Sequence, residues 1–345
     1  MKFANVGFVG CGSHSTNNIY PMLKYARCRL QAVCDTNEEL ASRNARVFGG
    51  RAVYTDAEQM LDSEKLDGVL VVGPPQIHYE IGKKVLERAI PLFIEKPPAP
   101  SLAEAEELAR LARANRTFVM TGFMKRHALT YRKIREMIAS GAFKPAAGFI
   151  KYSHWPATDL KWMLLAMSIH PIDLAIGLLG DVAEITSVMY QSDRAISLAL
   201  TLRFASGKWM QLMLDSSQPR IQERVEISGE IDGGNALIVV DNIIRMELHR
   251  QGMNGIDLVT SAGTPGLHEI DPVFDLDDIK TWRPDYGIPN MGQNSPFLQG
   301  YAGEVREFAD AILDHREPWP GTDDTTKAMR VIDAICRHPD GITRL

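Results

Sequence analysis

The sequence has no excess of positive charge and no long hydrophobic run. Lysine and arginine number 38 against 43 acidic residues, which gives a net charge of -5 and an isoelectric point near 6.0. Nucleic-acid-binding surfaces need clustered basic residues, so this balance argues against a nucleic-acid partner. No apolar run approaches the ~18 residues of a membrane span. The opening Met-Lys-Phe-Ala-Asn enters an apolar stretch at once and leaves no room for a secretory leader. We therefore expect a cytoplasmic protein without a membrane partner.

Cysteine is scarce, and metal-ligand spacing is absent. The sequence has 4 cysteines, and none forms a C-x-x-C pair, which argues against a disulfide framework or a zinc knuckle. They are Cys11, Cys28, Cys34 and Cys336. We interpret them as small buried hydrophobic side chains. The histidines at positions 127, 249, 268 and 315 also lack the spacing of a metal site, so the sequence predicts no metal.

The N-terminal residues contain the pattern of a dinucleotide-binding turn. An apolar run from Val6 to Val9 predicts a buried strand, and the turn Gly-Cys-Gly-Ser-His-Ser follows at residues 10–15. Gly10 permits a tight turn, and Gly12 lets the main chain approach a pyrophosphate. The N–H groups of a helix predicted at residues 17–25 would stabilise the charge of that pyrophosphate.

An acidic residue follows at the separation that a nucleotide requires. Asp35 ends a second predicted strand, residues 30–34, where a carboxylate can accept hydrogen bonds from a ribose diol. The third glycine of the pattern is absent, since Ser15 occupies its position. A turn that binds no nucleotide is the structural alternative. We predict that NAD binds here, and that Asp35 disfavours the 2′-phosphate of NADP.

Residues 1–122 alternate short apolar runs with segments of helical period, as parallel strands joined by crossover helices do. The predicted strands are residues 6–9, 30–34, 52–54, 68–72, 91–94 and 117–121. Further helices are predicted after Asp35 through Phe48, at 76–88 and at 102–114. Because these strands are continuously apolar, we expect burial on both faces. The sequence therefore predicts an α/β protein that begins with a doubly wound parallel sheet.

Beyond residue 122 the pattern changes to strands in succession. A helix to residue 140, a strand at 146–155 and a helical stretch at 161–179 precede strand-like segments at 195–204, 208–215, 220–228 and 236–240. Strands without intervening helices predict a second α/β domain, residues 123–345, with an open and mostly antiparallel sheet. We expect the open face to form a homodimer or homotetramer interface. Residues 262–297 read as a long irregular loop, and helical spacing returns at 304–313 and 323–336, where the helices can pack back on the first domain.

Two further candidate sites follow strand-like runs, where open α/β sheets bind ligands. The first is a turn that contains Gly73, Pro74 and His78, and its structural alternative is an ordinary turn into a helix. The second is Glu95-Lys96 before a rigid Pro-Pro exit, which would hold a cation at the sheet edge. Its alternative is an exposed ion pair that contributes almost nothing to stability.

These features together resemble a known enzyme family. The Gly10-x-Gly12 turn, Asp35, Pro74 and His78, Glu95-Lys96-Pro97, Gly122-Phe123 with Arg126, and Glu307-Phe308-Ala309-Asp310-Ala311-Ile312 are similar to the glucose–fructose oxidoreductase / inositol dehydrogenase / MocA family. The resemblance runs from residue 3 to about residue 336. It implies an N-terminal Rossmann domain, a C-terminal α/β domain with an open sheet, and NAD(P)-dependent oxidation or reduction of a sugar or cyclitol hydroxyl.

One catalytic motif of that family is incomplete in this sequence. The family pattern Asp-x-Gly-x-His-x-x-Asp aligns with residues 166–173, where His170 and Asp173 are kept but Ala166 replaces the first acid and Ser168 the glycine. Asp159 or Lys161 are alternative substitutes for the missing acid, and the sequence does not choose between them. A proline at residue 171 favours a helix start near Ser168.

A helix start at that point would disfavour imidazolium at His170 and leave a neutral base. The alternative for His170 is a buried histidine bonded to a main-chain carbonyl. By resemblance we assign catalysis to Lys96 and His170. The predicted substrate-binding residues are Arg126, Trp155, Trp162 and Asp173, with Trp282 as a further aromatic platform. The predicted cofactor-binding residues are Gly10, Gly12, Ser13, His14, Asp35, Gly73, Pro74, His78, Glu95 and Lys96.

We therefore expect an NAD-dependent oxidoreductase that transfers hydride between a nicotinamide and a hydroxyl of a sugar, glycoside or cyclitol. One alternative is an NAD-dependent glycosidase that oxidises its sugar transiently before elimination. Another is a sugar sensor that binds NAD without turnover, although a sensor need not keep both Lys96 and His170. The sequence does not identify the sugar, the oxidised carbon or the physiological direction.

Overall fold

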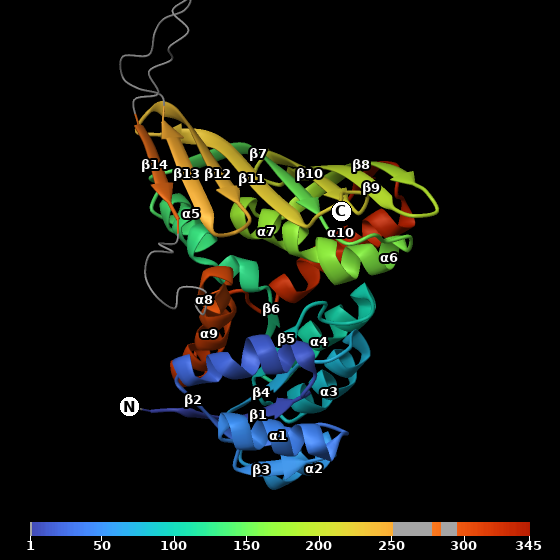
Figure 1. Cartoon of the computed structure of the whole chain (residues 1–345), viewed down its shortest axis with the longest axis vertical. Helices are drawn as coiled ribbons and strands as arrows, with labels where there is room; N and C mark the ends of the chain where they lie inside the picture. Colours follow the sequence, from blue (N-terminus) through green and yellow to red (C-terminus); the bar gives the residue numbers. More distant parts are fainter. Residues whose placement is uncertain (1, 251–277, 284–294) are drawn as a thin grey trace, which may run out of the picture.

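Two sheets separated by helices make up the protein (Figure 1). The computed structural model describes residues 2–250, 278–283 and 295–345. The first sheet has six strands in the order β3-β2-β1-β4-β5-β6, and all of its pairs are parallel. The strands are β1 (Ala4–Val9), β2 (Cys28–Cys34), β3 (Ala52–Tyr54), β4 (Gly68–Val71), β5 (Leu92–Glu95) and β6 (Val119–Gly122). The strand order reverses between β1 and β4, so the predicted doubly wound sheet is confirmed.

The crossover helices begin where short polar side chains cap them. The helices are α1 (Glu38–Phe48), α2 (Ala57–Ser63), α3 (Pro75–Glu87) and α4 (Leu102–Ala114). Asn37, Asp56 and Ser101 accept hydrogen bonds from the first turns of α1, α2 and α4. The sequence did not predict α2, which is only seven residues long.

The predicted helix at residues 17–25 forms differently. After a short helical start, the chain makes a π-helical turn, η1 (Ser15–Ile19), and a 3-10 segment, η2 (Tyr20–Tyr25). Pro21 lies at the start of η2 and cannot donate a main-chain hydrogen bond. We attribute the change of helix type at this point to that missing donor.

The second sheet has nine strands in the order β14-β13-β12-β11-β7-β10-β9-β8-β15. They are β7 (Lys144–Ser153), β8 (Val182–Gln191), β9 (Ile196–Phe204), β10 (Trp209–Asp215), β11 (Gln222–Ile231), β12 (Gly234–Asp241), β13 (Arg245–Arg250), β14 (Asp278–Trp282) and β15 (Gly341–Arg344). Among the strands that the structure describes in this sheet, only β7 and β10 pair in parallel, so the predicted mostly antiparallel sheet is confirmed.

Two edge strands of this sheet differ from the sequence-based expectation. Strand β14 lies inside the segment 262–297 that was expected to be irregular, and it pairs with β13. The prediction was therefore wrong for residues 278–282, and the structure places α8 (Ser295–Gln299) at the end of that segment. Residues 262–277 and 284–294 lie outside the described part of the chain. Strand β15, which pairs with β8, has only four residues and carries little periodic signal.

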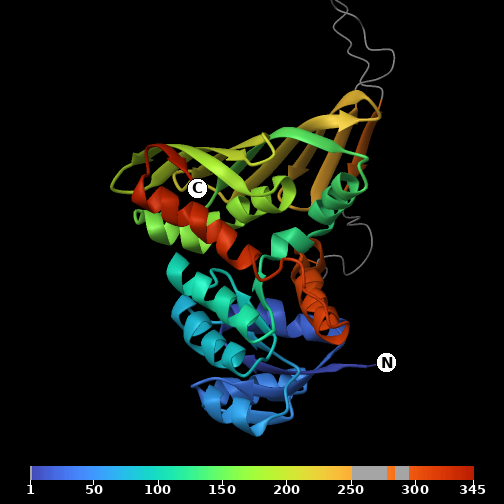
Figure 2. The same cartoon turned by 180° about the vertical axis from the view of Figure 1, so that it is seen from behind.

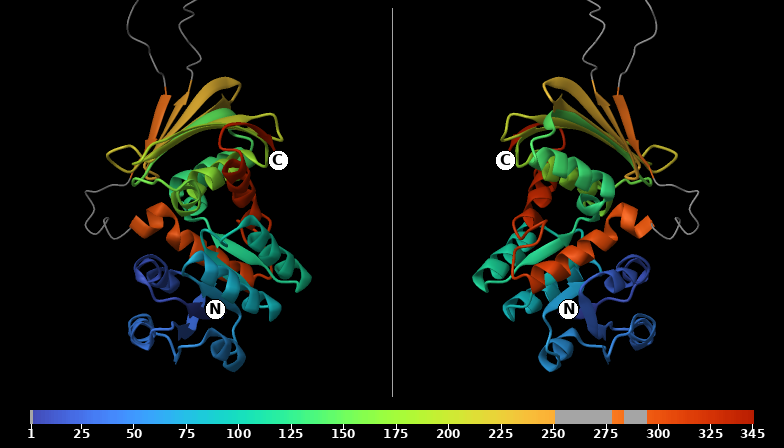
Figure 3. Two further views of the ribbon diagram at one scale, coloured as in Figure 1. Left: turned by 90° about the vertical axis from the view of Figure 1, so that its right-hand side faces the viewer. Right: turned by 90° about the vertical axis from the view of Figure 1, so that its left-hand side faces the viewer.

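Helices cover one face of the second sheet and lie between the two sheets (Figure 3). They are η3 (Met124–His127), α5 (Leu129–Ala139), α6 (Leu160–Met163), η4 (Leu164–Ser168), α7 (Ile169–Leu179) and α10 (Asp324–Arg337). Along β9, every second side chain from Ile196 to Phe204 is buried, as a half-covered sheet requires. The opposite face of the sheet points away from the rest of the molecule (Figure 1).

One helical stretch is long and apolar enough to cross a membrane by length and composition. It runs through α6, η4 and α7 from Leu160 to Leu179, and 67% of its most apolar window is buried inside the structure. Burial against the second sheet explains this apolar composition, because a helix surrounded by other elements is hydrophobic on most sides. We read it as a core helix.

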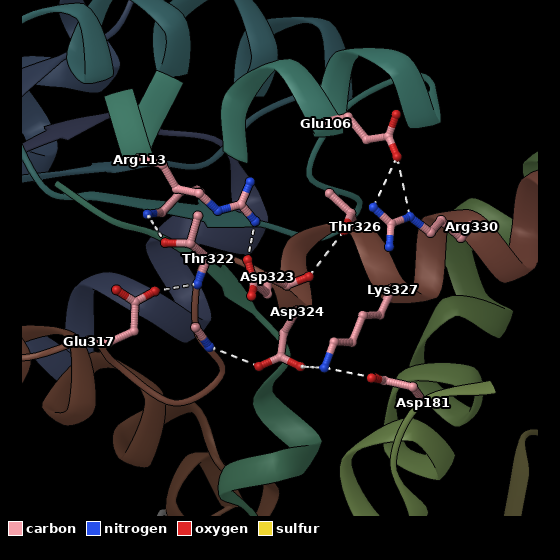
Figure 4. Close-up of polar contacts among 12 residues, drawn as sticks. Glu106, Arg113, Asp181, Glu317, Thr322, Asp323, Asp324, Thr326, Lys327 and Arg330 are labelled. Carbon is pink, nitrogen blue, oxygen red and sulfur yellow. Dashed lines mark hydrogen bonds and ion pairs between the residues drawn. The ribbon is translucent and has the colours of Figure 1, made fainter. Parts of the chain in front are cut away.

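The C-terminal helices connect the two sheets (Figure 2). Helix α9 (Tyr301–Leu313) packs on the first sheet, where the Phe308 ring contacts the rings of Phe93 and Phe118. Helix α10 packs on α4 and also on α7. Polar contacts at the start of α10 are drawn in Figure 4: Arg330 pairs with Glu106 at 3.1 Å, Arg113 with Asp323, and Lys327 with Asp181 at 2.8 Å. The last part of the chain therefore holds both sheets in one arrangement.

Candidate active site

The turn after β1 has the geometry that a nucleotide pyrophosphate needs. A Cβ on Gly10 would lie 1.9 Å from the carbonyl oxygen of Val72, and the φ of Gly10 is +102°, so no other residue fits there. A Cβ on Gly12 would meet nothing within 4 Å. Internal packing therefore does not exclude a side chain at Gly12, and the open space in front of it suits the close approach of a ligand.

Ser15 stands where the pattern has its third glycine. It is buried, and its hydroxyl donates to the carbonyl of Gly12 at 3.0 Å. The hydroxyl thus has a partner within the turn, and the substitution leaves the turn intact. The carboxylate of Asp35 accepts the N–H of Cys11 at 2.7 Å and the N–H of Asn37 at 2.9 Å. These bonds fix Asp35 beside the turn, at the carboxyl end of β2.

A pocket of about 290 Å³ opens beside this turn. Its lining brings together six of the predicted cofactor residues, Gly12, Ser13, His14, Gly73, Glu95 and Lys96, and it also includes Ser15 and Val72. Glu95 is 3% exposed, and its carboxylate lies 3.3 Å from the His14 ring and accepts the N–H of Lys96 at 3.0 Å. The alternative of an exposed Glu-Lys ion pair is therefore wrong.

His78 does not reach this pocket. Its side chain is fully buried, one ring nitrogen accepts the N–H of Gly73 at 3.0 Å, and the other lies 2.8 Å from the carbonyl of Pro97. Burial lowers the pKa of His78 to about 4, so the ring is neutral. His78 therefore ties the β4–α3 turn to the segment after Lys96, and its contact with cofactor stays a prediction. Pro74, by contrast, is exposed just before α3.

Lys96 connects the cofactor pocket to the second domain. Its ammonium donates to the main-chain carbonyl of Ala166 at 2.8 Å. Burial lowers the pKa of Lys96 below its usual 10.5, and the nearby Glu95 carboxylate opposes that shift. The carbonyl of Ala166 therefore contacts the lysine at the position where the family pattern has an acid.

The local helix geometry explains why the carbonyl of Ala166 has no partner within the helix and can accept the hydrogen bond from Lys96. Ala166 lies in the π-helical turn η4, in which a carbonyl is matched with the N–H five residues later. That residue is Pro171, which has no N–H. Asp159 caps α6 by accepting the N–H of Trp162 at 2.7 Å, and Lys161 is exposed. Neither of these two proposed substitutes contacts Lys96.

His170 lies one helical turn after Ala166, so both residues are on one face of the helix. The Nδ1 atom of His170 is buried and has no hydrogen-bond partner in the described structure. Burial lowers the pKa of His170 well below 6.5, and Lys96 and Lys125 lower it further. Helix α7 begins at Ile169, as expected from the sequence, although the helical turns of α6 and η4 precede it from Leu160. Burial and the nearby cations are the largest causes of the lowered pKa of His170.

Arg126 and Asp173 are paired with each other. Two guanidinium nitrogens of Arg126 donate to the Asp173 carboxylate at 2.7 and 2.9 Å, and both side chains are 2% exposed. A third contact joins Arg126 to Asp324 at 3.3 Å. The structure therefore gives both side chains a structural role, and substrate binding by them stays a prediction. They hold η3, α7 and α10 together behind His170.

The predicted aromatic platforms are separated along the chain. Trp155 and Trp162 are 58% and 50% exposed, just after β7 and on α6. Trp282 lies on the edge strand β14 beside Met246, at one end of the second sheet. Within the described part of the chain, none of the three forms a hydrogen bond or ring contact with Lys96 or His170, and their role as sugar platforms stays a prediction. Among the described residues, no group of three His, Cys, Asp or Glu side chains is arranged to hold a metal.

Sequence reasoning missed Lys125, which is buried beside the site. Its ammonium pairs with Glu223 and lies 4.4 Å from the centre of the Tyr152 ring. Burial lowers the pKa of Lys125 to about 7, and the charge of Lys96 acts in the same direction. Its place between Gly122-Phe123 and Arg126, inside a motif already noted, was the available signal.

Glu304 was missed as well. It is fully buried on α9, and neither of its carboxylate oxygens has a hydrogen-bond partner in the described structure. Burial raises the pKa of Glu304 well above 4.5, and the Glu95 carboxylate raises it further. Burial near the Glu95 carboxylate therefore favours the protonated form of this carboxyl group on α9. A lone glutamate in a periodic helix gives no sequence signal for this.

The fold and the turn geometry define an α/β oxidoreductase that binds a dinucleotide. Residues 4–123 match the family model described as "Oxidoreductase family, NAD-binding Rossmann fold". Residues 162–338 match "Oxidoreductase family, C-terminal alpha/beta domain". The chain therefore belongs to the glucose–fructose oxidoreductase / inositol dehydrogenase / MocA family. The predicted Rossmann domain and its NAD cofactor are confirmed.

Individual relatives agree with this family over most of the chain. The putative oxidoreductase YceM of Salmonella typhimurium is 23% identical over 345 residues, with 98% of each chain covered. A D-apiose dehydrogenase of Paraburkholderia graminis is 22% identical, with 74% of this chain and 72% of the relative covered. A solved levoglucosan dehydrogenase in complex with NADH and L-sorbose superposes with a TM-score of 0.80 at 17% identity, with 100% and 99% coverage.

Proposed function

We propose that this protein is an NAD-dependent dehydrogenase that acts on a hydroxyl of a sugar, glycoside or cyclitol. The observation that carries the proposal is the placement of Lys96 and His170. Lys96 lines the cofactor pocket and bonds to the carbonyl of Ala166, one helical turn before His170. A cation and a neutral imidazole therefore meet at the boundary between the NAD-binding domain and the second domain. The D-apiose dehydrogenase among the relatives supports a carbohydrate substrate.

The turn after β1 fits the cofactor. The main-chain N–H groups at Gly12, Ser13 and His14 would hold the pyrophosphate, since they stand at the start of the helical segment after β1. The carboxylate of Asp35 would accept hydrogen bonds from the adenosine ribose. Gly73, Glu95 and Lys96 line the pocket and would hold the nicotinamide, which would supply the hydride acceptor when NAD is bound.

Lys96 and His170 divide the work on the substrate hydroxyl. In alcohol oxidation, the neutral ring of His170 accepts the hydroxyl proton, because its lowered pKa keeps it unprotonated near pH 7. The ammonium of Lys96 stabilises the negative charge that develops on the oxygen. The ion pair of Arg126 and Asp173 ties η3 to α7, the helix that carries His170. Trp155 and Trp162, which are exposed, are candidate platforms for a sugar face.

A screen of sugars and cyclitols for NADH fluorescence tests this function. A dehydrogenase gives NADH in proportion to substrate consumed, and the Lys96→Met variant should form NADH at least about 10²-fold more slowly. Release of an aglycone without net NADH would instead identify an NAD-dependent glycosidase. Binding of NAD and sugar without turnover in either direction would identify a sensor and refute the proposal.

We also propose that the protein is cytoplasmic and assembles as a homodimer or homotetramer through the outward face of the second sheet. Exposed apolar side chains on that face support the proposal. They are Val188, Tyr190, Trp209 and Ile342, which are 65%, 69%, 46% and 70% exposed. Apolar area of this kind is commonly covered by another subunit. Light scattering that gives the mass of one chain at micromolar concentration would contradict the assembly.

A further inference from the structure

A second pocket lies apart from the cofactor pocket and shares no lining residue with it. Its volume is about 400 Å³, and it forms where η3, α5, α9 and the segment after α9 meet. Arginine dominates its wall, with Arg132, Arg135, Arg306 and Arg316 against the two carboxylates Glu307 and Asp310. The established family match and the proposed dehydrogenase activity assign no role to this pocket.

Both carboxylates in the wall are already neutralised. Glu307 accepts two hydrogen bonds from Arg316, at 2.6 and 2.9 Å, and a third from the N–H of Trp319 at 2.9 Å. Asp310 accepts a hydrogen bond from Arg27 at 2.7 Å. Of the other arginines in the wall, Arg132 lies 3.9 Å from Glu136, whereas Arg135 and Arg306 form no ion pair with the residues that the structure describes.

Two of those arginines have unused hydrogen-bond donors. Arg306 is exposed on α9 and makes no hydrogen bond or ion pair with any residue that the structure describes. The guanidinium of Arg135 stacks on the Trp319 ring, 3.6 Å from its centre, and also makes no hydrogen bond within the described part of the chain. Burial lowers the pKa of Arg135, and the like charges of Arg126 and Arg132 contribute to this. Unpaired guanidinium groups beside one another favour an anion between them.

His127 also lines the pocket, and one of its ring nitrogens has no partner among the described residues. The residue is 6% exposed, and its Nε2 atom is buried without a hydrogen-bond partner. Burial and the neighbouring arginines lower the pKa of His127 to about 3, so the ring is neutral. Its hydrogen bond to the main chain of Trp319 uses the ring N–H, which leaves Nε2 as an acceptor. A ligand with both negative charge and an O–H group satisfies these partners together.

We propose that this pocket binds a phosphoryl group, as inorganic phosphate or as a phosphate monoester. Arg135 and Arg306 donate to the anionic oxygens, and Nε2 of His127 accepts the O–H of a monohydrogen phosphate or of a neighbouring sugar hydroxyl. Planar guanidinium groups match the oxygen spacing of a phosphate. The site is coupled to the rest of the protein through Trp319, whose ring also lies 5.4 Å from the Arg126 guanidinium.

Titration calorimetry on the full chain tests the proposal, with NAD present at saturation so that the dinucleotide turn cannot take the added phosphate. Inorganic phosphate and glucose 6-phosphate are titrated separately, because the first represents the free anion and the second a sugar ester. We expect one site per chain. Arg306→Ala and Arg135→Ala should each weaken phosphate binding by about tenfold or more, since each removes hydrogen bonds to a charged group.

Arg110→Ala is the matched control, because Arg110 is an exposed arginine on α4 with only a 4.0 Å contact to Glu107. Its affinity for phosphate should equal that of the unmodified protein. Sulfate has no O–H near pH 7 and should bind more weakly; equal affinity would contradict the contact assigned to His127. Absence of heat at about 10 mM phosphate, or equal affinity in all three arginine variants, would overturn the site.

Discussion

Replacing Lys96 with methionine removes the ammonium and keeps most of the side-chain length. The structure aims this ammonium at the carbonyl of Ala166, 2.8 Å away, at the wall of the cofactor pocket. If the same ammonium stabilises the charge that develops on the substrate oxygen, its loss should lower kcat by about 10²- to 10³-fold, which corresponds to about 3–4 kcal/mol. NAD affinity should change little, because the pyrophosphate and ribose contacts are elsewhere.

The variant also leaves the Ala166 carbonyl without its lysine donor. An unsatisfied buried acceptor costs about 1–3 kcal/mol, so the thermal midpoint has to be measured beside kcat. Lys84→Met is the control, since Lys84 is a partly exposed lysine that bonds to Glu58 at 2.8 Å. Such a surface pair contributes at most about 1 kcal/mol. Full turnover by Lys96→Met on a confirmed substrate would refute the proposed mechanism.

The pH profile separates the roles of Lys96 and His170. The mechanism needs charged Lys96, whose pKa is below 10.5, and neutral His170, whose pKa is well below 6.5. The pH profile should therefore have two limbs. On the alkaline limb, activity falls around a pH below 10.5 as Lys96 loses its proton. On the acidic limb, activity falls around a pH below 6.5 as His170 gains one. His170→Asn should lower kcat and remove the acidic limb. A limb that persists unchanged in the His170→Asn variant would assign it to another group.

The other expected outcomes concern specificity, the altered motif and stability. The protein should prefer NAD to NADP by kcat/KM, and Asp35→Ser should narrow the preference because it removes a charge that repels a 2′-phosphate. Ala166→Asp should leave alcohol oxidation unchanged or lower it, and a gain would mean that the native chemistry differs from that proposed. Burial lowers the pKa of His78 from 6.5 to about 4, so the unfolded state binds more protons in that range and stability should fall as pH drops below 6.5. Between pH 7 and pH 5 this contributes about 2 kcal/mol, measured as the difference in urea unfolding between the protein and His78→Gln. Asp173→Asn should lower the free energy of unfolding by about 3 kcal/mol, because it leaves Arg126 buried without its bidentate partner; a change under about 1 kcal/mol would contradict that role.

Local patterns in the sequence predicted the first domain well because its signals are local. The Gly10-x-Gly12 turn and the acid at the end of β2 depend on positions within one β–α–β unit, and six continuous apolar runs identify a sheet buried on both faces. The second domain was predicted only in outline. Strands β14 and β15 have five and four residues, which are too few for periodicity to show.

The roles of individual polar residues could not be predicted, because partners far away in the sequence decide them. The guanidinium of Arg126 donates to Asp173, 47 positions later, and no local pattern shows that pairing. The bond between the His78 ring and the carbonyl of Pro97 likewise joins residues that no local pattern connects. Glu304 lies near Glu95 only because α9 returns to the first sheet. Motifs identify residue types in sequence order, whereas availability to a ligand depends on tertiary contacts.

The carbonyl of Ala166 also changes what Lys96 can do. A carboxylate at residue 166 would favour the charged lysine and raise its pKa, which would oppose the effect of burial. A carbonyl dipole orients the ammonium without a full negative charge, and only the Glu95 carboxylate opposes the lowering of the pKa by burial. Lys96 is therefore a stronger acid here than a lysine paired with the family's aspartate would be. A lysine with a lowered pKa can share its proton with the reacting oxygen more completely, so the loss of the acid is consistent with a more direct role for Lys96.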